Sequence, residues 1–125
     1  MRPVQILWHK KSRCLELVYE NGRRFKLSAE YLRVYSPSAE VTGHGGQGGQ
    51  LVSGKRFVSI QRIEPVGDYA LRFVFDDGHD SGLYTWRYLY ELAMRQPQKW
   101  TEYLEKLRQA GAKREPDDVT ILRLD

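Results

Sequence analysis

The side chains that most often carry chemistry in proteins are few in this chain and widely separated. Three histidines, His9, His44 and His79, lie far apart in the sequence, and Cys14 is the single cysteine. No Gly-x-Ser-x-Gly nucleophile motif occurs, and the cysteine has no evident catalytic partner. His79 stands out because it directly follows an Asp-Gly dipeptide, which is a strong turn signal. The main functional question is whether His79 is a ligand or only a turn residue.

Carboxylates occur in adjacent pairs at Asp76-Asp77 and Asp117-Asp118. Adjacent acids in a turn or a tail are usually solvated, so these pairs are weak candidates for general acid–base catalysis. Asp76, Asp77 and Asp80 together offer several oxygens to a divalent cation, but they lack the ligand spacing of a calcium loop. We therefore expect that the chain is not an enzyme.

A long glycine-rich loop at residues 35–55 contains two nucleotide-binding motifs by spelling alone. Residues 43–48 match the G-x-G-x-x-G dinucleotide fingerprint, but no apolar strand precedes them and no helix pattern follows. Residues 49–55 spell G-x-x-x-x-G-K, but Arg56 stands where the magnesium-binding Ser or Thr should be. The sequence therefore favours a loop without a nucleotide site.

The composition predicts one domain rather than several. The chain has 125 residues, and we assign residues 1–111 to the domain and residues 112–125 to a tail that is either an edge strand or disordered. Its net charge of +4 comes from 20 basic and 16 acidic residues that are scattered, so we do not expect a nucleic-acid partner. No apolar run approaches the ~20 residues that span a membrane. A lone cysteine without a signal peptide predicts a soluble cytoplasmic protein.

Local signals predict strands followed by a short helix in the first half. Residues 4–19 contain two apolar runs on either side of a basic turn, which is typical of an antiparallel pair. Asn21-Gly22 is a strong hairpin signal and leads into a half-buried strand at residues 23–27. Ser28 is a favourable N-cap for a helical turn at residues 29–33.

The second half shows the same order of signals. Residues 57–63 alternate as a strand, and residues 64–67 read as a turn. Residues 71–75 form a second alternating segment, Asp77-Gly78 supplies a turn, and residues 79–85 form a plausible return strand.

Two helices are predicted after this hairpin. Thr85 is a natural N-cap, and the residues that follow it have helical spacing of apolar side chains: Trp86, Leu89, Tyr90 and Ala93. A second helix restarts at Gln96-Pro97, because proline is well tolerated in the first helical turn, and it ends at Gly111.

The two halves resemble each other. Residues 18–32 and 74–89 share an aromatic residue, an acid, an Asn/Asp-Gly turn, a strand, a Ser/Thr cap, an aromatic residue and a leucine, with one residue inserted in the second copy. We therefore predict an α+β fold, in which a small antiparallel β-sheet is built from two hairpin-plus-helix units and followed by a C-terminal helix.

Three segments carry a resemblance to a known family: FDDGHDSGLYTWRYL, SAEYLRVYSPSAEV and IEPVGDYAL. The chain resembles the gamma-butyrobetaine hydroxylase-like N-terminal domain family over residues 4–107. The resemblance implies a small zinc-binding module that precedes the jelly roll of certain dioxygenases. Related domains are fused to P-loop ATPases that carry iron–sulfur clusters, or form short bacterial proteins of this kind. The implied role is accessory and not catalytic.

The zinc site of that family carries over only in part. The resemblance places the histidine ligand at His79 and the three cysteine ligands at Ser36, Ser38 and Val41. Serine hydroxyls are poor zinc ligands and valine is none, so a Cys₃His site is not expected. A replacement site for Zn or Fe that uses His79, His44 and a carboxylate such as Asp80 remains open. The alternative is that His79 makes a hydrogen bond that fixes the hairpin against the glycine-rich loop.

We therefore expect a non-catalytic accessory domain that binds a protein partner linked to iron–sulfur clusters or iron enzymes. The alternative is a Zn- or Fe-binding module centred on His79 and His44. The residues expected at the contact surface are Tyr31, Arg33, His44, Lys55 and His79.

Overall fold

The first half of the chain is a three-stranded antiparallel meander in the computed structural model, which describes residues 1–38, 50–118, 122 and 124. The strands follow in the order β1 (Gln5–His9), β2 (Cys14–Val18) and β3 (Arg24–Ser28). Gly22 closes the β2–β3 turn with a φ of 85°, which glycine adopts without a Cβ clash. The predicted strands and the Asn21-Gly22 turn are confirmed.

Helix α1 (Ala29–Val34) follows β3 directly, as the predicted cap requires. The Ser28 hydroxyl oxygen accepts a hydrogen bond from the backbone N–H of Tyr31 at 3.0 Å. This N–H has no partner within the helix, so the cap stabilises its first turn. The helix buries Leu32 completely and thereby attaches the first sheet to the core.

The second half forms another three-stranded antiparallel sheet. Its strands are β4 (Ile60–Val66), β5 (Ala70–Phe75) and β6 (Leu83–Thr85). The strand predicted at residues 57–63 therefore begins and ends later, and residues 64–66 belong to it rather than to a turn. Pro65 is compatible with β4 because this strand lies at the edge of the sheet, where alternate residues direct their N–H groups away from the neighbouring strand and proline is tolerated. The turn itself lies at Gly67, whose φ is 53°.

The return strand is shorter than predicted. Residues 79–85 were expected to pair throughout, but only residues 83–85 pair with β5. The preceding residues turn away from the sheet, and two of them, His79 and Ser81, contact the segment that follows α1. This departure creates the polar cluster described below.

Two helices complete the fold. Helix α3 (Trp86–Met94) begins at Thr85, whose hydroxyl oxygen accepts from the N–H of Tyr88 at 3.1 Å. Helix α4 (Gln96–Ala110) carries proline in its first turn and ends at Gly111, which has a left-handed φ of 64°. Both predicted helices are confirmed, and the class is α+β with two sheets.

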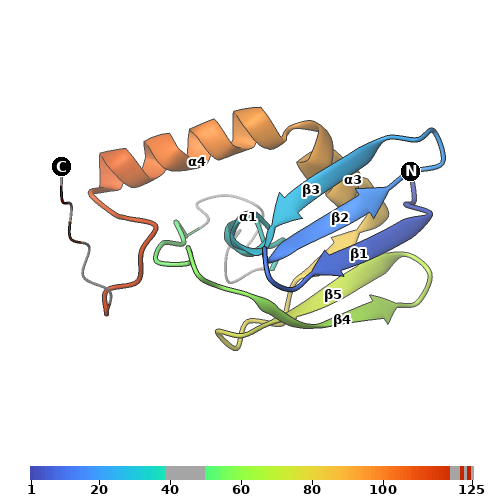
Figure 1. Ribbon diagram of the computed structural model, residues 1–125, viewed down its shortest axis with the longest axis horizontal. Coiled ribbons are helices and arrows are strands. Elements are labelled where there is room, and N and C mark those ends of the chain that lie inside the picture. Colours follow the sequence, from blue (N-terminus) through green and yellow to red (C-terminus); the bar gives the residue numbers. More distant parts are fainter. Residues whose placement is uncertain (39–49, 119–121, 123, 125) are drawn as a thin grey trace.

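One hydrophobic core joins the two halves. In Figure 1, β4 and β5 lie beside the first sheet, and α3 lies behind the strands. Helix α4 lies past β3, along the top of the view. The core takes side chains from both sheets and from α1 and α3, including Leu15, Leu27, Leu32, Phe73, Phe75, Tyr84 and Leu89. A smaller cluster packs α4 against the C-terminal end of α1 through Val34, Tyr103 and Leu107. The halves are thus parts of one folded body.

Hydrogen bonds from tyrosine hydroxyls connect the two halves. Tyr31 of α1 donates to the carbonyl of Leu92 in α3 at 2.7 Å, and Tyr88 of α3 donates to the carbonyl of Tyr35 at the end of α1 at 2.5 Å. Tyr84 donates to the carbonyl of Leu32 at 2.6 Å. Burial raises the pKa of Tyr88 to about 12, so its hydroxyl remains a donor at neutral pH. Each helix end therefore depends on the opposite half.

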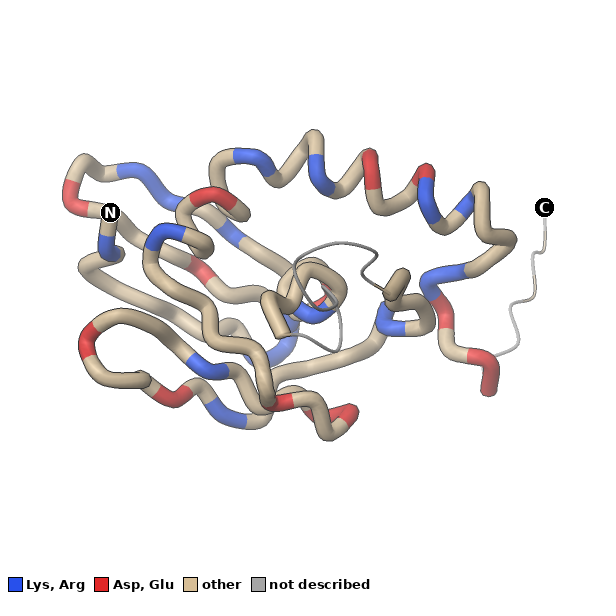
Figure 2. The backbone as a smooth tube through the Cα atoms, turned by 180° about the vertical axis from the view of Figure 1, so that it is seen from behind, with Lys and Arg blue, Asp and Glu red and all other residues tan. Residues whose placement is uncertain are grey.

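Charged residues of both signs are interspersed along the described chain, as Figure 2 shows. Among these residues, no helix is long and apolar enough to cross a membrane. After α4 the chain returns to the body, where the N–H groups of Gly54 and Arg56 donate to the carbonyls of Lys113 and Arg114, both at 3.0 Å. The domain boundary at residue 111 stays a prediction, and residues 119–121 lie outside the described part.

Candidate functional site

A serine–histidine cluster lies where the β5–β6 connection meets the segment after α1. The hydroxyl oxygen of Ser36 lies 2.8 Å from Nε2 of His79, and both residues are buried, with 0% and 7% of their surface exposed. The backbone N–H of Ser38 also donates to the Ser36 oxygen at 3.3 Å, and the Ser38 hydroxyl lies 2.9 Å from that of Ser81. These bonds fix the hairpin against the chain after α1, which is the structural role considered for His79.

Gly82 makes this close approach sterically feasible. A Cβ added at this position would overlap the Ser36 hydroxyl and would lie 3.1 Å from Cδ of Pro37. Contacts this short require the neighbours to move, and Ser36 is completely buried. The absence of a side chain at Gly82 is therefore part of the site, and nothing in the local sequence pattern predicts it.

Asp77 is the centre of a second, charged cluster. Its Oδ2 atom lies 2.8 Å from Nε of Arg33 and 2.6 Å from Nζ of Lys55. Its Oδ1 atom accepts from the backbone N–H of His79 at 3.0 Å. The three charged side chains are mostly buried, with 11% (Arg33), 18% (Asp77) and 24% (Lys55) of their surface exposed.

The electrostatics of this cluster favour the ionised carboxylate. Burial alone would raise the pKa of Asp77, but hydrogen bonds from Lys55, the His79 backbone and Arg33 outweigh it and lower the pKa to about 2. Two cations face one carboxylate, and Nη1 of Arg33 is buried without a hydrogen-bond partner. The cluster therefore carries an excess of positive charge.

The Ser36–His79 pair does not have the arrangement of a catalytic dyad. Ser36 is completely buried, so its hydroxyl cannot reach a substrate without a rearrangement. The Asp77 carboxylate accepts from the backbone of His79 and not from its ring, so it does not orient the imidazole as a triad carboxylate would. The pair connects the β5–β6 connection to the segment after α1.

The donors around His79 do not fit a structural zinc site. Two of the positions implied for cysteine hold Ser36 and Ser38, whose hydroxyls are poor zinc ligands. Asp80 is 52% exposed and lies 3.6 Å from Arg72. Among the described residues, no three His, Cys, Asp or Glu side chains gather as a metal site would require.

The structure brings together three of the residues predicted at the contact surface. Arg33, Lys55 and His79 all contact Asp77. Tyr31 was predicted at this surface but is 1% exposed, and its hydroxyl is directed into the core. His44, predicted both as a metal ligand and as a contact residue, lies outside the described residues, as does Val41.

Asp77 was not predicted to be the centre of the site. Its bond to the N–H two residues further on is the usual behaviour of an aspartate in a turn and was accessible from the sequence. Its pairing with Arg33, which is 44 residues away, has no local signal. Only the fold brings these charges together.

Comparison with known proteins gives the family. The model described as "Gamma-butyrobetaine hydroxylase-like, N-terminal" matches residues 6–90. Two proteins with NMR solution structures are similar to this chain, each with a TM-score of 0.79. The first is 49% identical, and its alignment covers 98% of this chain and 97% of its own. The second is 48% identical, and its alignment covers 99% of this chain and 92% of its own. A crystallised protein of unknown function from Acidithiobacillus ferrooxidans, assigned to the DUF971 family, is 37% identical over 74% of this chain and 92% of its own, with a TM-score of 0.62.

No curated protein matches the chain. The family match covers both hairpin-plus-helix units, and the predicted resemblance is confirmed. The chain belongs to the gamma-butyrobetaine hydroxylase-like N-terminal domain family.

Proposed function

We propose that this domain is a non-catalytic accessory module that binds a protein partner through the face formed by Arg33, Lys55 and Asp77. The observation that carries the proposal is the convergence of Arg33 and Lys55 on one carboxylate oxygen. These cations belong to two chain segments, one before and one after residues 39–49. The bonds hold the two segments in a defined position beside the β5–β6 turn.

The charge of this face indicates the chemistry of the partner. Two cations and one carboxylate leave a positive charge that the described residues do not neutralise. Lys55 is the most exposed of the three, so it is the group best placed to meet an acidic group on the partner. An acidic protein surface would complement this face, because opposite charges increase the rate and the specificity of association.

The link to iron rests on the family. The matching model takes its description from the N-terminal part of gamma-butyrobetaine hydroxylase. The resemblance also includes domains fused to ATPases that carry iron–sulfur clusters. We therefore propose that the partner is an iron–sulfur protein or an iron-dependent enzyme.

Affinity capture at native expression level tests this proposal. The wild-type chain is expected to recover an iron–sulfur or iron-dependent protein, whose direct binding is then measured with the purified partner. Lys55→Gln is expected to weaken that binding, whereas Lys106→Gln, which removes an exposed lysine of α4, is expected to leave it unchanged. Recovery of no iron-related protein, or equal binding by the two variants, would contradict the proposal.

A second candidate function is metal binding centred on His79. The observation behind it is that His79 is buried 2.8 Å from Ser36, two positions where the resemblance places metal ligands. Because serine is a poor ligand, such a site would also need His44, which lies outside the described residues. Metal analysis of protein purified without a histidine tag tests it. Stoichiometric zinc or iron that is lost in His79→Ala would support this function. A metal-free wild-type protein, or metal that persists in the variant, would exclude His79 as its centre.

A further inference from the structure

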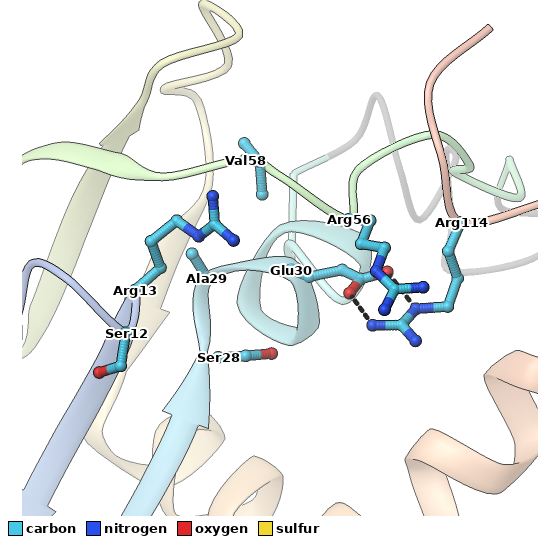
Figure 3. Close-up of a pocket in the computed structure, with 8 residues that line it drawn as sticks. All are labelled: Ser12, Arg13, Ser28, Ala29, Glu30, Arg56, Val58 and Arg114. Carbon is cyan, nitrogen blue, oxygen red and sulfur yellow. Dashed lines mark hydrogen bonds and ion pairs between the residues drawn. The ribbon is translucent and has the colours of Figure 1, made fainter. Parts of the chain in front are cut away.

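A small pocket with basic walls lies between the β1–β2 turn and the start of α1, away from His79. Its volume is about 190 Å³. Figure 3 shows Arg13 on one side of the pocket, and Arg56 and Arg114 beside Glu30 on the other. The polar residues that line it are Ser12, Arg13, Ser28, Glu30, Arg56 and Arg114.

Arg13 is held in an unusual backbone conformation. Its φ is 55°, and it is the only non-glycine residue with a positive φ in the part of the chain that the structure describes. Residues other than Gly, Asn and Asp seldom adopt this backbone conformation, because their Cβ atom approaches the backbone carbonyl oxygen. The carbonyl of Arg13 accepts from the N–H of Ala29 at 2.9 Å, which fixes the turn against α1. The backbone thereby sets the direction of the Arg13 side chain.

The guanidinium of Arg13 lacks the carboxylate partner that its neighbours have. Arg114 makes two hydrogen bonds to Glu30, at 2.7 and 2.9 Å, and Arg56 lies 2.9 Å from Glu115. Arg13 makes only a long 3.5 Å contact with the Phe57 carbonyl and lies over the Phe57 ring. No carboxylate among residues 1–38 and 50–118 pairs with it. One positive charge in the pocket wall is therefore unbalanced.

The hydroxyl groups of the pocket add donors. The Ser28 oxygen already accepts from the N–H of Tyr31, so its own proton is available to donate. Because donors stand on opposite sides of the pocket, a ligand with oxygens in several directions can use more of them than a planar carboxylate can.

We propose that this pocket binds a phosphate group, with the Arg13 guanidinium as its principal charge partner. The Ser28 hydroxyl and the N–H groups of Arg56 that do not face Glu115 supply further donors. The pocket has room for a phosphate and a small attached group, so the ligand class is inorganic phosphate or a small phosphate monoester. This site is separate from the face proposed to bind a protein partner, and neither proposal depends on the other.

A phosphate titration followed by ¹⁵N NMR tests the proposal, with sodium chloride keeping the ionic strength constant. Saturable shifts are expected at residues 12–14, 28–30 and 56–58. Arg13→Asn is expected to weaken binding by about tenfold or more, because a charge-assisted hydrogen bond is lost. Asparagine tolerates a positive φ, so this variant should keep its fold. Arg62→Gln, which changes an exposed arginine of β4 outside the pocket, is the matched control.

Four outcomes would overturn the proposal. Phosphate shifts that do not saturate would exclude a site, and equal affinities of Arg13→Asn and the wild type would exclude the proposed contact. Acetate that binds as tightly as phosphate would contradict the assignment to phosphate. Shifts confined to the surroundings of Lys55 would place the anion elsewhere. Failure here is distinguishable from failure of the proposed function, because Lys55→Gln should leave phosphate binding unchanged and Arg13→Asn should leave partner capture unchanged.

Discussion

Replacing Asp77 by asparagine removes the single negative charge between Arg33 and Lys55. Asparagine keeps the shape and one acceptor oxygen, so the bond from the His79 backbone can persist. Arg33 and Lys55, which are 11% and 24% exposed, lose their counter-charge. Leaving partly buried cations unpaired is destabilising, so we expect Asp77→Asn to lower the free energy of unfolding.

The size of this effect follows from the pKa of Asp77. The pKa falls from its ordinary value of 3.8 to about 2 in the folded protein. At about 1.36 kcal/mol per pH unit, this difference corresponds to about 2.4 kcal/mol of stability at neutral pH. Because 18% of the side chain is exposed and solvent screens the interaction, we expect about 2 kcal/mol.

The effect has a defined pH dependence. The folded state lowers the pKa, so the contribution is complete above the unfolded value near 4 and is lost as the pH falls through about 2. Urea unfolding of the wild type and of Asp77→Asn should therefore differ by about 2 kcal/mol near pH 7, and the difference should nearly vanish near pH 2.

Asp76→Asn is the matched control for this experiment. Asp76 is the adjacent carboxylate and accepts from the N–H of Ser59 at 3.0 Å, but it has no cation partner among the described residues. Asparagine can still accept this hydrogen bond, so we expect a loss of stability well below that of Asp77→Asn. The reasoning would be refuted by a difference between wild type and Asp77→Asn that stays the same at both pH values, or by equal losses in the two variants at neutral pH.

Two further predictions concern the serine–histidine cluster. Gly82→Ala is expected to lower the free energy of unfolding, measured in urea, by about 2 kcal/mol, because the new Cβ overlaps the Ser36 hydroxyl. Adding Ser36→Ala to this variant should recover part of the loss. If it recovers nothing, the overlap is not the cause. The triple variant Ser36→Cys, Ser38→Cys, Val41→Cys should bind zinc stoichiometrically in metal analysis, because it restores thiolates at the three positions where the family resemblance places cysteine ligands. Zinc that survives His79→Ala in this variant would disprove the assignment of His79 as the fourth ligand.

Short-range signals in the sequence predicted most of the fold correctly. Ser28 and Thr85 cap helices because a hydroxyl oxygen reaches an N–H only three residues further on. Gly22 and Gly78 mark turns, with φ values of 85° and 91°, because their conformation is a property of the residue itself. Such features depend only on residues that are close in the sequence, so they can be predicted from the amino-acid sequence without a structure.

Features that depend on tertiary contacts were not predictable from local pattern. Pro65 read as part of a turn, and only its place in an edge strand makes it compatible with β4. Glu30 is buried against Arg114, which is 84 residues away. The 2.8 Å approach of Ser36 to His79, which are 43 residues apart, has no local signal either.

The crossed tyrosines make the two halves one cooperative unit. Tyr31 follows its cap by the same three positions as Tyr88 does, and each donates to the last turn of the other half's helix. Carbonyl groups in a final helical turn have no partner within the helix. A single half would therefore expose its helix end and half of an apolar core to water. The two similar halves therefore do not form two small domains in tandem, and we expect that neither half folds stably on its own.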